Sequence, residues 1–294
     1  MRLFRVWLSL ASVLFLLAHP SWAEVPGSPT PPDRLPGAGT TAHSPPVRPQ
    51  VQMLAQAHVV YLAETHDRPE DHQAQLQIIQ ALHQQRPDLV IGMEMFQQPY
   101  QPTLNRYLAG QLTEAQLQAA TQYQQRWGFP WEFYAPVLRF AQANQVPVVA
   151  LNLPSEITRT VARTGLGGLT IAERQAIPDD ILKGPDSYRD RLLSFYHNNH
   201  QGHGNSAGFE RFFLAQVLWD ETMANRIAEL IKANPRQLVV VLVGQGHVNY
   251  GEGIPDRVAR RLSSPSLKQV SILLSPTQEQ VQDKAIADYF WYFP

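Results

Sequence analysis

The chain has 294 residues, of which 44% are hydrophobic and 17% are charged, and its formal net charge is −1. This composition is typical of a globular protein with one sizeable domain or two small ones. The balanced charge, with no basic run, argues against a nucleic-acid partner. Because the chain has no cysteine, disulfides, thiolate ligands and a thiol nucleophile are excluded.

The amino terminus has the features of a secretory signal peptide. Two arginines precede an apolar run from Val6 to Ala18, and small residues follow before Glu24. An uncleaved membrane anchor is the alternative, but the run is shorter than the ~20 residues that a spanning helix needs. We therefore expect residues 1–23 to be removed. The mature protein would be exported to the periplasm or the outside, soluble, and without a membrane span.

Residues 24–50, "EVPGSPTPPDRLPGAGTTAHSPPVRPQ", are rich in Pro, Gly, Ser and Thr and almost free of large apolar residues. Such a segment cannot bury enough apolar surface to offset the entropy of ordering, so it predicts a disordered, Pro-rich linker.

Residues 51–294 are predicted to form a single α/β domain with a mainly parallel sheet and helices on both faces. Short runs rich in Val, Ile and Leu have the composition of strands buried on both faces. These runs are residues 58–63, 89–93, 146–151, 237–243 and 269–274. Helix-like stretches at 69–85, 133–143 and 206–232 lie between them. Residues 152–236 contain no convincing strand, which predicts a helical insertion.

Polar side chains stand where several of these strands end. They are Glu64, His66, Glu94, Asn152 and His247. In open parallel sheets, ligands bind in the crevice at the carboxyl ends of the strands. Glu64, His66, Glu94 and His247 would form one pocket that suits a divalent metal such as Zn or Mn, or general acid-base chemistry. A loop histidine, or a carboxylate in a structural cap or ion pair, is the alternative for each.

A second group of candidates is less tied to the strand ends. It comprises His72, Tyr134, Tyr196, His197, His200, His203, Gln216 and Asp220. Three of its histidines lie in "YHNNHQGHGN", where they are either ligands or the polar end of a helix. Gln216 and Asp220 are one helical turn apart among apolar neighbours and need an internal partner or a ligand. The aromatic residues suit a large flat apolar ligand, although such residues more often form core.

Six motifs occur in order: "LAETHD", "GMEMF", "ALNLP", "HQGHG", "FFLAQVLWDETMANRI" and "VGQGHV". Through them the chain from about residue 51 to residue 262 resembles the ChaN-like haem-binding uptake proteins, exported bacterial proteins of the Tiki superfamily. The resemblance implies haem as the cofactor and a role in haem and iron uptake. The superfamily is marked by two G-x-x-H motifs. The second is intact at Gly244–His247, whereas the first, Ala63–His66, has Ala in place of Gly.

The same resemblance implies alternatives. Family members are often lipoproteins, but this chain lacks the cysteine that carries the lipid. The wider superfamily includes metal-dependent proteases and esterases, so a divalent-metal hydrolase using the same Glu and His residues is the second hypothesis. An interaction module with a degenerate site is the third. The residues leave open which His or Tyr ligates iron, and whether two copies share the ligand in a homodimer.

Overall fold

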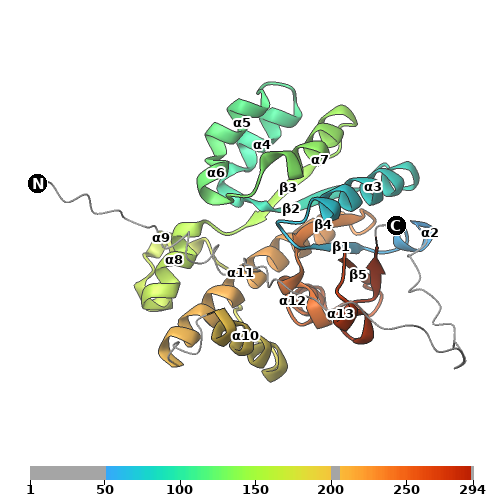
Figure 1. Cartoon of the computed structure of the whole chain (residues 1–294). Helices are drawn as coiled ribbons and strands as arrows, with labels where there is room; N and C mark the ends of the chain where they lie inside the picture. Colours follow the sequence, from blue (N-terminus) through green and yellow to red (C-terminus); the bar gives the residue numbers. More distant parts are fainter. Residues whose placement is uncertain (1–50, 200–205, 293–294) are drawn as a thin grey trace, which may run out of the picture.

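A computed structural model describes residues 51–199 and 206–292 (Figure 1). The expected signal peptide and linker, residues 1–23 and 24–50, lie outside the described residues, as do His200 and His203. The described part has the predicted α/β architecture, with helices on both faces of a parallel sheet. Its six strands are β1 (Val59–Glu64), β2 (Val90–Gln97), β3 (Val148–Asn152), β4 (Val239–Gly244), β5 (Gln269–Leu274) and β6 (Tyr289–Trp291).

The sheet separates two apolar cores because successive side chains of a strand point to opposite faces. Val60 and Leu62 of β1 pack into one core with the helices before β3, and Val59 and Tyr61 pack into the other with the helices after β3. All six residues of β1 and of β4 are buried. This double burial explains why these strands read as continuous apolar runs rather than as alternating ones.

The helices fall into two groups along the chain. The first group is α2 (Val51–Leu54), α3 (Pro69–Gln85), α4 (Gln101–Leu108), α5 (Glu114–Thr121), α6 (Tyr123–Arg126) and α7 (Trp131–Ala143). The second group is α8 (Ser155–Thr164), α9 (Ile171–Gln175), α10 (Asp186–Asn199), α11 (Ser206–Ala233), α12 (Ile254–Leu262) and α13 (Gln278–Gln282). In Figure 1, α8, α9 and α10 gather on the side of the molecule away from α3. The described residues between β3 and β4 form no strand.

The order of the strands defines where a ligand site belongs. The sheet runs β3-β2-β4-β1-β5-β6. From β1 the chain proceeds towards β3 on one side, and from β4 it proceeds towards β6 on the other. The direction therefore reverses between β1 and β4, which pair with Glu64 opposite Gly244. Such a reversal leaves a crevice at the carboxyl ends of the two strands, where open α/β sheets bind their ligands.

Three details differ from the sequence-based expectation. β2 runs to Gln97 rather than stopping at Met93, so Glu94 lies within a strand and not after one. Its pairing with β4 nevertheless ends at Met93, and its pairing with β3 is irregular between Met93 and Gln97. The short edge strand β6 was not expected, and neither were the helices between β2 and α7. None of the helices in residues 51–199 and 206–292 combines the length and the apolar character that a membrane crossing requires.

Candidate functional site

A cavity of about 490 Å³ opens at the carboxyl ends of β1, β2 and β4. One side, which we call the strand-end wall, consists of Glu64, His66, Glu94, Gly244 and His247. The opposite side, the helical wall, comes from α8, α10 and α11 and consists of Thr158, Arg159, Leu192, Phe195, Phe212, Gln216 and Trp219. The fold thus brings all four strand-end candidates to one pocket, and their role there is a prediction.

Glu64 and His66 form a carboxylate–imidazole pair at the end of β1. Nδ1 of His66 donates to Glu64 Oε1 at 2.8 Å. Burial lowers the pKa of His66, but the hydrogen bond that it donates to Glu64 and the charge of Glu94 outweigh burial and leave that pKa raised. The side chain of His66 is still 22% exposed. Because Nδ1 is engaged, the ring can offer only Nε2 to a ligand.

The buried carboxylate of Glu64 is held from behind by side chains outside the pocket. Tyr134 OH donates to Oε1 at 2.6 Å, and the Gln75 amide donates to Oε2. His72 also lies outside the pocket, and its Nε2 contacts the backbone carbonyl oxygen of His66 at 3.0 Å. These contacts satisfy a carboxylate that would be costly to bury alone. Tyr134 and His72 therefore position the Glu64–His66 pair and do not line the cavity.

His247 is held between two carboxylates. Its Nδ1 donates to Asp220, which also accepts from Tyr188 OH at 2.5 Å, and its Nε2 lies 3.4 Å from Glu94 Oε1. Burial lowers the pKa of His247, but Glu94 and Asp220 prevail and raise it to about 10. The protonated imidazolium is therefore the stable form. The Gln216 amide is 3.1 Å from Nδ1.

Glu94 links the neighbouring strands. Its Oε2 accepts the backbone N–H of Gly244 at 2.8 Å. Burial raises the pKa of Glu94, but the charge of His247 and its hydrogen bond, together with His66 and Gly244, lower it to about 2. The ionised carboxylate thus lies between two imidazoles, where its charge is balanced.

Gly244 is required by the packing of the strand-end wall. A Cβ atom at this position would lie 2.8 Å from Cε1 and Nε2 of the His66 ring. That separation is well inside van der Waals contact, so only glycine lets the imidazole lie flat against β4. The glycine of the motif Gly244–His247 therefore makes room for His66, which follows β1.

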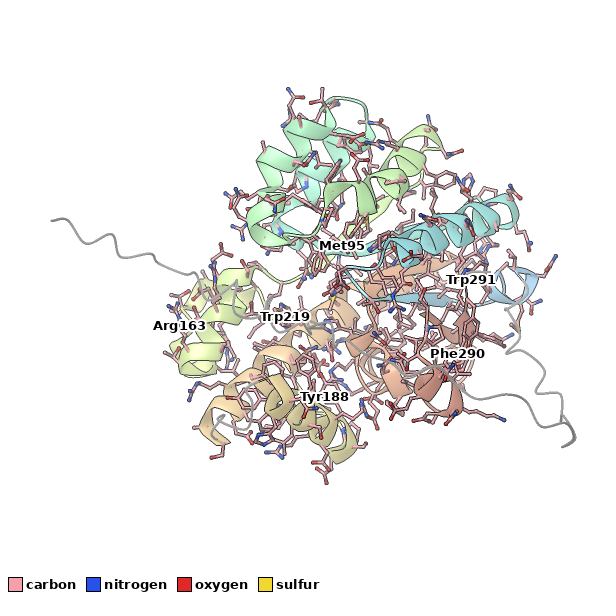
Figure 2. The ribbon with its side chains drawn as sticks, in the orientation of Figure 1. Met95, Arg163, Tyr188, Trp219, Phe290 and Trp291 are labelled. Carbon is pink, nitrogen blue, oxygen red and sulfur yellow. The ribbon has the colours of Figure 1, made fainter. Side chains whose placement is uncertain are left out.

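Aromatic rings flank the histidines. The His66 ring lies 4.9 Å from the Trp127 ring, nearly perpendicular to it, and 5.0 Å from the Phe129 ring. Trp219, labelled in Figure 2 near the centre of the molecule, has its ring 6.4 Å from that of His247. Together with Phe195 of α10, these side chains give the cavity broad apolar surfaces beside the charged strand-end wall.

Of the remaining described candidates, only Gln216 lines the cavity. Tyr196 is buried among Phe209 and Phe212 between α10 and α11. His197 is exposed near the end of α10. Asp220 acts only through His247, whereas Gln216 lines the pocket itself. His200 and His203 lie outside the described residues.

The carboxylates of the pocket accept hydrogen bonds from neighbouring groups. Glu64 accepts from Tyr134, Gln75 and His66, and Glu94 accepts from Gly244. In the part of the chain that the structure describes, no three His, Asp or Glu side chains converge in a way that could hold a metal ion. The divalent-metal centre stays a prediction.

Several residues that line the pocket or support its side chains escaped the sequence analysis. Gln75, Tyr188 and Trp219 lie on helices, and their approach to the site depends on how each helix rotates against the sheet. A buried polar residue within an apolar helical stripe is the signal that identified Asp220, and Gln75 carries the same signal on α3. Arg126 and Arg159 gave no signal, because cations on short helices are ordinarily solvated.

Comparison with known proteins identifies a family that this chain matches. The family model described as haem-binding uptake, Tiki superfamily, ChaN matches residues 50–258. The protein RETICULATA-RELATED 5, chloroplastic, of Arabidopsis thaliana is 26% identical over 262 residues, which cover 82% of this chain and 35% of that protein. The chain therefore spans about a third of the length of this relative.

Among solved structures, the chain is similar to ChaN of Campylobacter jejuni, described with cofacial haem binding. The TM-score is 0.65 at 19% identity, covering 82% of this chain and 89% of that one. A mutant of the erythromycin esterase EreC in its open conformation overlaps less well, with a TM-score of 0.47 at 15% identity over 76% of this chain and 71% of that one. The first similarity establishes a shared fold, including the parallel sheet.

Proposed function

The chain belongs to the ChaN family of haem-binding uptake proteins of the Tiki superfamily, and from this premise we propose that its pocket binds haem with His66 as the ligand of the iron. A haem site needs one or two axial ligands and a wide apolar slot. The cavity of about 490 Å³ lies within the usual range of small-molecule pockets, and the rings of Trp127, Phe129, Phe195 and Trp219 line it. Bound haem would supply the iron that the protein carries.

The single observation that carries this proposal is the state of His66. Its Nδ1 donates to Glu64, so Nε2 is available to a ligand while the ring is fixed in orientation. A carboxylate on the far nitrogen is the usual way in which proteins orient a ligating histidine and increase its basicity. His247 is a poorer ligand because Asp220 and Glu94 hold it as the imidazolium. We assign it the role of balancing the buried carboxylates.

The test is a haemin titration of the purified protein followed by its absorption spectrum. Wild-type protein is expected to give a shifted, sharpened Soret band. The His66→Ala variant is expected to lose about tenfold or more in affinity, as a removed ligand worth about 1.4 kcal/mol or more would require. Added imidazole should restore the wild-type spectrum of His66→Ala, because the free base can occupy the space that the side chain leaves.

His247→Ala is the matched control, because this histidine lies in the same pocket without an available nitrogen. We expect it to bind haemin with the Soret position of the wild type. A wild-type protein that binds no haemin would overturn the function. Haem that survives both substitutions unchanged would overturn the site and direct attention to His197, His200 and His203.

Export and a role in uptake complete the proposal. The charged start, the apolar run and the small residues before Glu24 support removal of residues 1–23 and a soluble protein outside the cytoplasm. The amino-terminal sequence of the mature protein, purified from the producing cell, tests this. A chain that retains Met1 in the membrane fraction would contradict it.

Hydrolysis without a metal is the second candidate, and one observation favours it. His66 is oriented by the carboxylate of Glu64, as general bases in hydrolases are, and the imidazolium of His247 lies in the same pocket. If haemin does not bind, the wild type should be assayed on small esters alongside His66→Ala and His247→Ala. Loss of ester cleavage in both variants, with chelator having no effect, would support this alternative.

A further inference from the structure

The pocket has a second charged region at its rim. The strand-end wall pairs Glu64 and Glu94 with His66 and His247, whereas the rim formed by α6 and α8 carries two arginines, Arg126 and Arg159. Ser155 and Thr158 line the cavity beside them. A ligand in this pocket therefore meets paired carboxylates and imidazoles on one side and guanidinium groups at the rim.

Arg126 is fixed in place by its partners. Its Nη1 and Nη2 donate to the two carboxylate oxygens of Glu156 at 3.0 and 2.8 Å, and Nη1 also donates to Gln97 Oε1 at 2.8 Å. The guanidinium lies 5.2 Å from the centre of the Tyr100 ring. This bidentate ion pair largely neutralises the carboxylate of Glu156. It also holds the guanidinium of Arg126 in one orientation, so that Arg126 supports the rim rigidly.

Arg159 is less engaged. Its Nε donates to the backbone oxygen of Ser155 at 3.2 Å, and its Nη2 is 3.7 Å from Glu156, a distance too long for a strong hydrogen bond. Its Nη1 has no hydrogen-bond partner among residues 51–199 and 206–292. With two guanidinium groups and one carboxylate, this rim keeps a positive charge, and Arg159 presents it to the cavity.

We propose that Arg159, supported by Arg126, forms an anion subsite that binds a carboxylate side chain of the tetrapyrrole, an inference that rests on the proposed function. At the strand-end wall, Glu64 and Glu94 already pair with His66 and His247, so this wall offers no unpaired guanidinium to an acidic group. At the rim it meets a planar guanidinium whose fork matches two carboxylate oxygens. The subsite thus fixes the in-plane orientation of the macrocycle and selects a ligand that is apolar in its body and acidic at one edge.

The experiment compares haemin with haemin dimethyl ester, in which both carboxylates are masked, in one detergent-containing buffer. Affinities come from Soret titrations. Wild-type protein is expected to prefer haemin by about tenfold, the effect of one charge-assisted contact at a partly exposed site. Raising the salt concentration should reduce this preference, because the rim is open to solvent.

Arg159→Gln is expected to abolish the preference for haemin over the ester. Arg159→Lys should keep part of it, since lysine retains the charge without the fork. Arg163→Gln is the matched control, because Arg163 follows one turn later on α8 and is exposed away from the pocket; it should keep the full preference (Figure 2). Because each variant is judged by a ratio of two affinities, a general loss of stability does not alter the reading.

The outcomes separate the two proposals. If wild-type protein binds haemin and its ester equally well, or if Arg159→Gln keeps the preference, the subsite is wrong while haem binding stands. If wild-type protein binds neither compound, haem binding itself is wrong and the tetrapyrrole subsite falls with it.

Discussion

The strand-end wall and the helical wall of the pocket are built in opposite ways. Apart from Gly244, the first consists of ionisable groups that are mostly buried and paired with one another or with neighbouring side chains. The second consists of side chains on three helices, among them Phe195, which is 43% exposed. Substituting one member of a buried, coupled pair lowers the free energy of unfolding strongly, whereas substituting an exposed side chain lowers it little. We therefore expect the strand-end wall to provide the ligand of the iron and the helical wall to determine which ligand fits the pocket.

The largest effect is expected from Asp220→Ala. This substitution leaves the imidazolium of His247 and the hydroxyl of Tyr188 without their buried acceptor. Breaking a buried charged pair from one side costs about 3–5 kcal/mol of unfolding free energy, which denaturant titration measures. Glu229→Ala on the same helix is the control, because its pair with Arg226 is solvent-exposed and should cost about 1 kcal/mol or less. Equal effects would mean that the pair of Asp220 with His247 is no more costly to break than an exposed pair.

Gly244→Ala is expected to act next in size. The added methyl group must displace the His66 ring, because it would lie 2.8 Å from two ring atoms. Overpacking of this kind costs about 1–3 kcal/mol, and haemin affinity should fall with it. Gly246→Ala, two residues further on, adds a methyl group with no atom within 4 Å and should leave both quantities unchanged. A Gly244→Ala protein with wild-type Soret titration would show that His66 does not hold the ligand.

The pH dependence of stability sharpens the view of the strand-end wall. The pKa of His247 is raised from 6.5 to about 10, so its contribution is complete below pH 6.5 and is lost as pH rises towards 10. The pKa of Glu94 is lowered from 4.5 to about 2, so its contribution is complete above pH 4.5 and is lost as pH falls towards 2. The difference in unfolding free energy between wild type and His247→Gln should be largest between pH 4.5 and 6.5.

That difference should shrink steadily from pH 7 to pH 10 in denaturant titrations of the protein without ligand. A difference that stays constant over this range would mean that His247 is neutral in the folded protein. A neutral His247 would no longer be a poorer ligand than His66, and the choice between the two histidines would lose its basis.

The smallest effect is expected on the helical wall. Phe195→Ala removes a half-exposed ring that stacks on Phe212 at 6.2 Å. We expect a stability loss of about 0.5–1 kcal/mol and a loss of haemin affinity of about threefold from reduced apolar contact. Leu182→Ala is the control, because Leu182 is similarly exposed but lies outside the pocket. An affinity loss as large as that of His66→Ala would mean that Phe195 on the helical wall contributes as much to the binding free energy as His66 does.

The parallel sheet was predictable because strands buried on both faces leave a strong signal in sequence. Glu64, His66 and His247 could be placed near one another because each follows such a run. Glu94 was found for the same reason, although β2 continues beyond it. The pairing of β2 with β4 ends at Met93, and this end of the pairing, rather than the end of the strand, places Glu94 at the crevice. Arg159 and Trp219 could not be placed, because the position of a helical side chain depends on packing between elements that sequence periodicity does not describe. The three residues of β6 are too few to show a period.

The hydrogen bond from Gly244 N–H to Glu94 gives this protein an internal reporter for spectroscopy. A backbone amide that donates to an ionised carboxylate, rather than to a strand partner, senses the charge of that carboxylate directly. The nuclear magnetic resonance signal of the Gly244 proton should therefore lie well downfield and move when Glu94 or its imidazole neighbours change protonation. Its exchange with deuterium should slow when a ligand closes the cavity. One glycine signal would thus follow occupancy of the pocket without any label on the ligand.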